Sequence, residues 1–130
     1  MKALDHTTWL KEGRQFLQIA QRSYQSRNKL TPEILYNVLG LAVEKCLMAA
    51  LDMHGRLPDN HTFTDLIDAT KQVGEIDVSI ADQLRKFESY QNICPVFAGY
   101  HRAELPDGAI LEMIATAEAV QTWAEKMIAA

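Results

Sequence analysis

The sequence predicts an all-α protein, a single up-and-down bundle of about five helices that covers residues 1–130. Apolar residues recur at spacings of three and four along most of the chain, as they do on the buried face of a helix. No stretch shows the strict apolar and polar alternation of a half-buried strand. With 48% hydrophobic and 23% charged residues, the chain has the composition and length of one globular domain that needs neither disulfides nor metals.

The first predicted helix runs near Asp5–Arg27 and has two unlike sides. Its apolar residues fall on one arc of the helical wheel, which we expect to face the core. The opposite side is basic and rich in glutamine. This basic stripe is interpreted either as a surface that holds phosphates or as a solvated outer face. The apolar arc contains Trp9, Phe16, Leu17, Ala20 and Tyr24, and the basic stripe contains Lys11, Arg14, Arg22, Gln15, Gln18 and Gln25.

The second predicted helix, near Thr31–His54, starts with a capping threonine followed by Pro32 in the first turn. It is apolar nearly all round, which is typical of a helix buried on several sides. It is therefore either the central helix of the bundle or half covered by a second subunit. We expect a homodimer that uses exposed apolar residues of this helix or of the last helix.

Three further helices are predicted near Thr62–Val73, Ser79–Cys94 and Asp107–Ala129. Thr62 opens the first of them with a capping box, and Gly74 is expected to end it. Pro95 is expected to stop the next helix, because proline cannot donate a helical hydrogen bond.

The charge of the chain is unevenly distributed. The net charge is −4, which argues against a general nucleic-acid binder. Residues 1–30 hold six basic and two acidic side chains, a net of +4, whereas residues 31–130 hold seven basic and fifteen acidic ones, a net of −8. Opposite signs in the two parts favour a charged partner or self-association.

The cysteines and the N-terminal residues indicate a cytoplasmic protein. Cys46 and Cys94 both lie in apolar helical surroundings, where free thiols behave as small buried hydrophobes in a reducing compartment. The chain starts with polar residues and has no signal-like apolar core. No apolar run approaches the ~20 residues of a membrane span, so no membrane contact is expected.

Three stretches give the chain a resemblance to the HEPN family. AVEKCLMA at residues 42–49 resembles the family signature A-x-E-K-x-L-K-A, with Met48 where a lysine is usual. LPDNHTF at residues 57–63 resembles the P-x-x-H-x-L segment, with Phe63 in the apolar place. Tyr100-His101-Arg102, followed by Leu105-Pro106-Asp107, is similar in a disturbed form to the Arg-Tyr-Pro region before the last helix.

The resemblance implies an up-and-down helical bundle that is often dimeric. Many small members of the family sit beside a nucleotidyltransferase-fold partner, in toxin–antitoxin-like pairs. Other members are metal-independent ribonucleases that carry R-x(4–6)-H, in which the arginine and histidine meet at a dimer cleft.

Arg56 and His61 fit the R-x4-H spacing and are the candidate catalytic pair. A histidine can serve as general acid or base near neutral pH, while an arginine stabilises charge on a reacting phosphate. The pair lies earlier than in the family's ribonucleases, where this chain offers only His101-Arg102 in reverse order. In the alternative interpretation, His61 anchors the loop beside the third helix and Arg56 is solvated.

Other chemistry finds little support in the sequence. His54 and His61, with Asp52 or Asp59, match no compact metal-binding pattern, so no metal site is predicted. No glycine-rich phosphate loop is present and no cofactor is predicted. Glu44 and Lys45 lie on an otherwise apolar helix, so we expect each to be paired, with Arg14 or another neighbour.

The resemblance, together with the basic stripe of the first helix, therefore implies a non-catalytic HEPN-type module that binds a nucleotide or RNA and acts with a nucleotidyltransferase-fold partner. One alternative is a metal-independent ribonuclease that uses Arg56 and His61, and another is a helical scaffold with no ligand. The candidate ligand-binding residues are Lys11, Arg14, Arg22, His101 and Arg102.

Overall fold

The computed structural model describes residues 5–26, 30–90, 105 and 108–129. These residues form five α-helices, and no strand occurs among them, which confirms the all-α prediction. The helices are α1 (His6–Gln25), α2 (Pro32–Met53), α3 (Phe63–Thr70), α4 (Val78–Ser89) and α5 (Ala109–Ala129).

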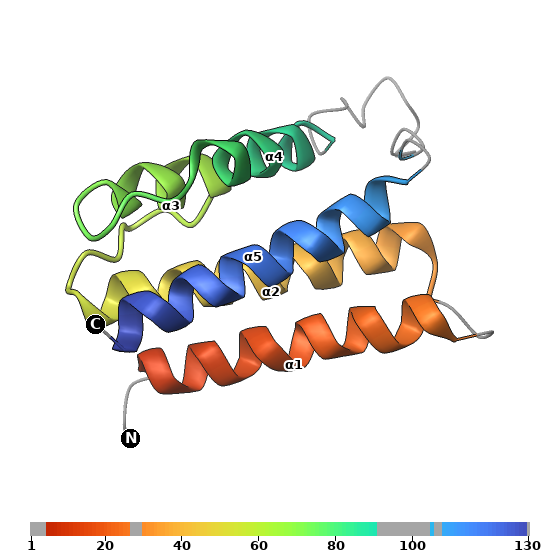
Figure 1. The fold of residues 1–130 in the computed structure, drawn as a ribbon, viewed down its shortest axis with the longest axis horizontal. Coiled ribbons are helices and arrows are strands. Elements are labelled where there is room, and N and C mark those ends of the chain that lie inside the picture. Colours follow the sequence, from red (N-terminus) through yellow and green to blue (C-terminus); the bar gives the residue numbers. More distant parts are fainter. Residues whose placement is uncertain (1–4, 27–29, 91–104, 106–107, 130) are drawn as a thin grey trace.

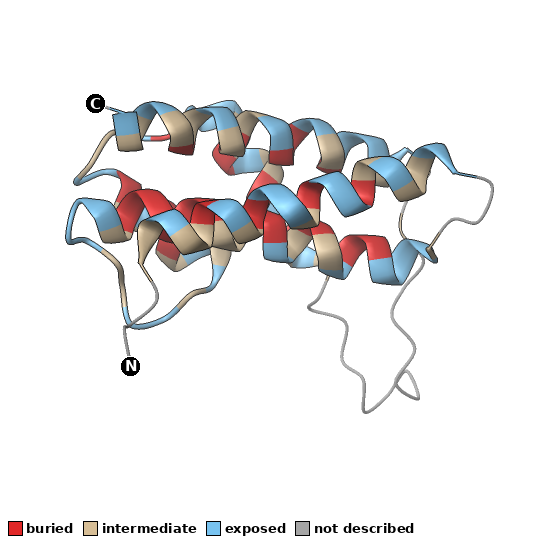
Figure 2. Cartoon of the chain, turned by 90° about the horizontal axis from the view of Figure 1, so that it is seen from below, coloured by how far each residue is buried: buried red, intermediate tan, exposed pale blue. Residues whose placement is uncertain are grey.

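The helices lie in three layers, with α2 and α5 side by side in the middle (Figure 1). Helix α1 covers one side of this pair and the shorter helices α3 and α4 cover the other. Helices α2 and α5 run in the same direction, because α3 and α4 return the chain to the end at which α2 began. The buried residues lie on the faces that the helices turn toward one another (Figure 2).

The predicted start signals act as caps. The side chains of Asp5, Thr31, Thr62 and Asp77 accept hydrogen bonds from backbone N–H groups in the first turns of α1, α2, α3 and α4. Each bond satisfies a donor that has no partner within its helix. In the Thr62 cap, the hydroxyl also donates to the Asp65 carboxylate at 2.8 Å. The predicted cap is therefore present, although the Asp65 carboxylate accepts from the Thr62 hydroxyl and not from the backbone N–H of a capping box.

Two helices end earlier than predicted. Helix α3 ends at Thr70 rather than Val73, and the chain then turns through Gly74. After Thr70 the N–H groups of Gln72 and Val73 donate to the backbone oxygens three residues back, of Ala69 and Thr70, and the Thr70 hydroxyl donates to the Ile67 oxygen. These three-residue closures tighten the chain into a turn.

Helix α4 ends at Ser89 instead of continuing to Cys94. The Tyr90 N–H turns back to the Phe87 oxygen at 3.2 Å, a tighter closure than the helical one. The Ser89 hydroxyl donates to the Lys86 oxygen, so it competes for the last carbonyl groups of the helix. Cys94 lies outside the described residues.

Helix α2 is the core of the molecule, and α1, α3 and α5 all pack against it. Half of its length is buried, including Leu39, Leu47, Ala50 and Leu51, which have no measurable exposure. A central position within one chain, which is one of the two arrangements predicted for this helix, is observed. Ile34, Leu41 and Met53 remain exposed on it.

Helix α2 is also long and apolar enough to cross a membrane by length and composition alone. This differs from the expectation that no apolar run approaches that length. Within the bundle, 61% of its most apolar window is buried. The core helix of a soluble protein passes the same test, so the finding is weak support for a membrane span.

Helices α1 and α2 approach most closely at Gly13. A Cβ atom on Gly13 would lie 2.7 Å from Cys46 Sγ and 3.2 Å from the Ala42 backbone oxygen. Glycine is therefore the residue that lets the two backbones meet. Burial raises the pKa of the Cys46 thiol to about 12, so the sulfur at this contact is a packing group and not a nucleophile. Beside it, Lys45 Nζ lies 3.3 Å from Glu12 Oε2 and links the same two helices.

Two glycine substitutions test this contact. We expect Gly13→Ala to lower the free energy of unfolding by about 1–2 kcal/mol, because overpacking at ~1–3 kcal/mol outweighs the helical preference for alanine. Gly40, on α2, is the matched control, since a Cβ there would meet only Phe63 Cζ at an ordinary 4.0 Å. Gly40→Ala is expected to raise the free energy of unfolding by up to ~1 kcal/mol. Urea unfolding followed by circular dichroism measures both. Equal effects of the two substitutions would contradict the close approach.

Candidate functional site

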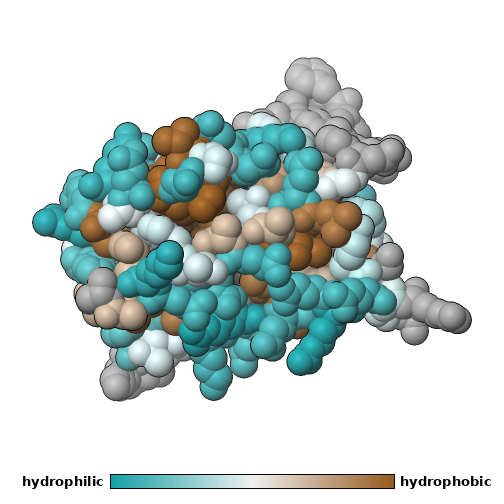
Figure 3. Space-filling view, viewed as in Figure 1, coloured by the Kyte–Doolittle hydropathy of each residue, from teal (hydrophilic) through white to brown (hydrophobic). Residues whose placement is uncertain are grey.

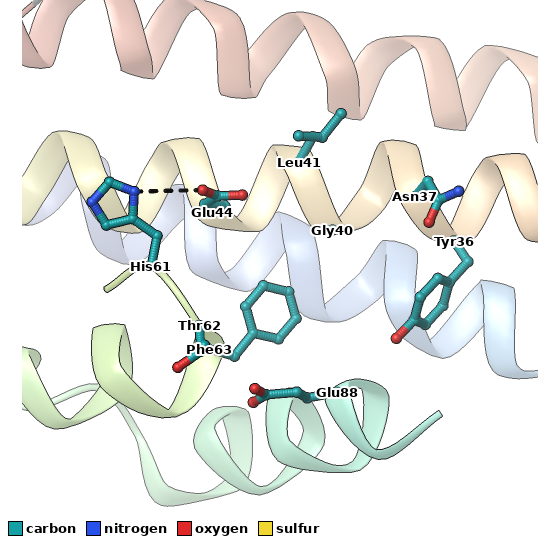
Figure 4. Close-up of a pocket in the computed structure, with 9 residues that line it drawn as sticks. All are labelled: Tyr36, Asn37, Gly40, Leu41, Glu44, His61, Thr62, Phe63 and Glu88. Atoms are coloured by element: carbon teal, nitrogen blue, oxygen red, sulfur yellow. Dashed lines mark ion pairs between the residues drawn. The ribbon is translucent and has the colours of Figure 1, made fainter. Parts of the chain in front are cut away.

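A pocket with a volume of about 590 Å³ lies between α2, the start of α3 and the end of α4 (Figure 4). We call it the α2–α4 pocket. The Phe63 ring and Leu41 provide apolar surface, and carboxylates come from Glu44 and Glu88. The described lining residues are Tyr36, Asn37, Gly40, Leu41, Glu44, His61, Thr62, Phe63 and Glu88.

His61 and Glu44 face each other at one end of the pocket (Figure 4). His61 Nδ1 lies 3.7 Å from Glu44 Oε1, and both side chains are about one-third exposed. Glu44 belongs to the stretch that resembles A-x-E-K-x-L-K-A, and His61 to the stretch that resembles P-x-x-H-x-L. The fold therefore brings together one residue from each of the two motifs.

Glu88 of α4 forms another wall of the α2–α4 pocket and also holds the start of α3. One of its carboxylate oxygens accepts from the Thr64 N–H at 3.2 Å and from the Thr64 hydroxyl at 3.1 Å. Tyr36 supports the same wall from α2, because its hydroxyl donates to the Phe87 backbone oxygen at 2.5 Å. No motif or spacing in the sequence indicates Glu88 as a site residue, because its position in the site depends on how α4 packs.

Arg56 lies outside the described lining of the pocket. It follows Gly55, which has a φ of +69° and ends α2 in a left-handed turn. The Arg56 N–H donates to the Leu51 oxygen at 2.8 Å and the Gly55 N–H donates to the Asp52 oxygen at 2.9 Å, which is the Schellman arrangement. The Arg56 backbone thus closes the helix, while the residue as a whole is exposed.

A second concavity, the α1–α5 groove, lies between α1 and α5. It consists of two adjoining hollows of about 510 and 420 Å³ that share Gln21 and Glu118. Arg14 lines the first hollow and Arg22 the second. The sequence-predicted basic stripe thus borders a real groove, although the exposed Lys11 is not part of its described lining.

Acidic residues of α5 partly neutralise the α1–α5 groove. Arg14 Nη2 donates to Glu125 Oε2 at 2.6 Å, and Gln21 Nε2 donates to Glu118 Oε2 at 3.0 Å. The hydrogen bond from Arg14 is the main reason that the pKa of Glu125 is lowered from its ordinary 4.5. Arg14 therefore pairs with Glu125 and not with Glu44. Lys45 pairs with Glu12. In the described part of the chain, Lys11 and Arg22 form no ion pair.

The remaining candidates are not among the described lining residues of these two concavities. His101 and Arg102 lie outside the described residues. His54 Nε2 is 2.9 Å from the Met127 backbone oxygen, a contact that joins the ends of α2 and α5. Over residues 5–26, 30–90, 105 and 108–129, no group of three or more His, Cys, Asp and Glu side chains is placed to hold a metal ion.

Comparisons of the chain with protein-family models, with curated proteins and with solved structures found no match.

The Arg14–Glu125 ion pair gives a pH-dependent prediction. Because the pKa of Glu125 is lowered by folding, its contribution to stability is present above the ordinary pKa of 4.5 and is lost as the pH falls through the lower folded value. Glu125→Gln should lower the free energy of unfolding at pH 7 by less than ~1 kcal/mol, since the pair is exposed. The difference from wild type should shrink below pH 4.

Glu118→Gln is the control, because Glu118 accepts from the uncharged Gln21. Urea unfolding at pH 7 and pH 3.5 measures both variants. A Glu125→Gln effect that stays the same at both pH values would show that the pair does not stabilise the α1–α5 contact through charge.

Proposed function

We propose that this protein is a non-catalytic, HEPN-like binding module that contacts the phosphates of a nucleotide or single-stranded RNA through the outer face of α1. The observation that carries the proposal is the separation of Arg56 from the α2–α4 pocket, together with the free cations of α1. This outer face carries the exposed side chains Lys11, Gln15, Gln18, Arg22 and Gln25.

The surroundings of Arg56 and His61 favour binding over cleavage. Cleavage of RNA by such a pair needs an arginine and a histidine that converge on one phosphate. Here His61 faces the carboxylate of Glu44, and Glu88 lines the same pocket. Two carboxylates repel a phosphate, and no described lysine or arginine lines the pocket to offset them. The pocket therefore suits a phosphate poorly.

The outer face of α1 suits phosphates better. Lys11 and Arg22 are eleven residues apart, which places them on the same side of the helix and roughly 16 Å apart along its axis. Both are exposed, and neither is held by an acidic side chain of the described chain. The exposed glutamines between them can bond sugars and bases. Two phosphate contacts with a short polar surface fit a ligand of several nucleotides.

The same proposal includes a homodimer and a nucleotidyltransferase-fold partner. Exposed apolar side chains remain for such contacts: Ile34 on α2, and Leu111 on α5, which is 53% exposed. Apolar side chains gather in patches over the α3–α4 layer and over the first half of α5 (Figure 3). Light scattering at tens of micromolar should give twice the chain mass, and a chain mass alone would remove the dimer from the proposal.

The RNA contact is tested by fluorescence anisotropy with a short labelled single-stranded RNA at low salt. Lys11→Gln with Arg22→Gln should abolish measurable binding, because both phosphate contacts are lost. Wild-type affinity should fall with salt with a logarithmic slope of about −1.4, as expected for two phosphates of a single strand. The RNA should remain intact throughout the titration.

The matched control is Lys71→Gln with Arg85→Gln, which removes the same charge from the α3–α4 side, where both residues are exposed. Loss of binding in both double variants would mean that only net charge matters and that α1 holds no site. Cleavage of the RNA that disappears in both Arg56→Ala and His61→Ala would replace the proposal with the ribonuclease alternative.

A further inference from the structure

We propose that the α2–α4 pocket is a second binding site, distinct from the α1 face, and that it takes a small organic cation: an amidinium, guanidinium or ammonium group carried on a flat or apolar body. The inference depends on the shape, lining and charge of the pocket, and not on the proposed contact of α1 with phosphates.

The pocket has the dimensions of a small-molecule site. Its volume of about 590 Å³ lies within the range of roughly 300–1,000 Å³ that is usual for ligand pockets. Three elements build it, and hydrogen bonds hold two of its walls together, from Thr64 to Glu88 and from Tyr36 to the end of α4. A ligand would therefore meet a largely preformed surface.

The charge of the lining selects a cation. Glu44 and Glu88 reach the pocket from different helices, and the described lining contains no lysine or arginine. The two hydrogen bonds from Thr64 go to Glu88 Oε2, and His61 lies nearest Glu44 Oε1. Among the described residues, each carboxylate thus keeps one oxygen for a ligand. Amidinium and guanidinium groups bind carboxylates through two parallel N–H donors, which makes this pairing stronger than a neutral hydrogen bond.

The apolar part of the pocket suits a flat body. Figure 4 shows the Phe63 ring extending between Gly40 and Glu88, and Leu41, the next residue of α2, also belongs to the lining. Gly40 adds no side chain, and a Cβ there would only touch Phe63 at 4.0 Å. An aromatic wall next to carboxylates stabilises a cation through its ring face as well as through burial of the apolar body.

Benzamidine is a suitable probe, because it joins a flat ring to an amidinium group, and benzamide is its neutral counterpart of the same shape. Isothermal titration of the full chain at pH 7.5 should show millimolar or tighter binding of benzamidine and at least tenfold weaker binding of benzamide. Glu44→Gln should weaken benzamidine binding about tenfold. Gly40→Leu should abolish it, because the new side chain fills the pocket.

Glu88→Gln should also weaken binding, but Glu88 caps the start of α3 and its loss affects the fold. The binding site is therefore tested with Glu44→Gln and Gly40→Leu, and circular dichroism shows whether both variants remain helical. Glu118→Gln, which removes a carboxylate from the α1–α5 groove, should leave benzamidine binding unchanged. Equal binding of benzamide, binding that survives both pocket variants, or no binding at 10 mM would each overturn the proposal.

Discussion

The close approach of α1 and α2 at Gly13 is the constraint on which the rest of the molecule depends. It brings the two backbones within reach of direct contact, where the Cys46 sulfur and the Ala42 oxygen leave no room for a side chain. Because α2 is apolar nearly all round, α5 and α3 must cover the surface that α1 leaves. The apolar arc of α1 then faces inward, and its lysine, arginine and glutamine side chains face outward. The α2–α4 pocket lies on the far side of α2, where the short helices cover it only in part.

This arrangement separates the two kinds of charge in the sequence. The described basic residues of the N-terminal part, Lys11, Arg14 and Arg22, lie exposed on α1, and the acidic remainder supplies carboxylates of α5 and of the α2–α4 pocket. Glu125 pairs with Arg14, so Lys11 and Arg22 are the cations of α1 that no described acidic side chain holds. Glu44 and Glu88 make the pocket unfavourable for phosphate and favourable for a cation. A single chain of low net charge can thus present two surfaces of opposite preference.

The local features of the fold were predictable from the sequence, and the contacts between distant residues were not. The caps at Asp5, Thr31 and Thr62 depend on a few adjacent residues, and all are present. The predicted ends of α3 and α4 were wrong, because the hydroxyl groups of Thr70 and Ser89 donate to nearby backbone oxygens. Helical periodicity in the sequence does not indicate such hydrogen bonds. Pairing of Glu44 and Lys45 was expected from the cost of an unpaired charge on an apolar helix, yet the partners, His61 and Glu12, depend on packing. Glu88 reaches the pocket from α4, and no spacing in the sequence indicates that it lies near Glu44.

The central claim is that ligand phosphates contact the outer face of α1 and not the region of Arg56 and His61. Chemical-shift mapping of the ¹⁵N-labelled chain with a short single-stranded RNA tests it most directly, because every assigned amide reports its own surroundings. We expect the largest chemical-shift changes at the amides of Lys11, Gln15, Gln18 and Arg22. The chemical shifts of the Gly40, Glu44 and His61 amides should stay unchanged. Shifts that concentrate instead at Arg56 and His61, with α1 unaffected, would contradict it.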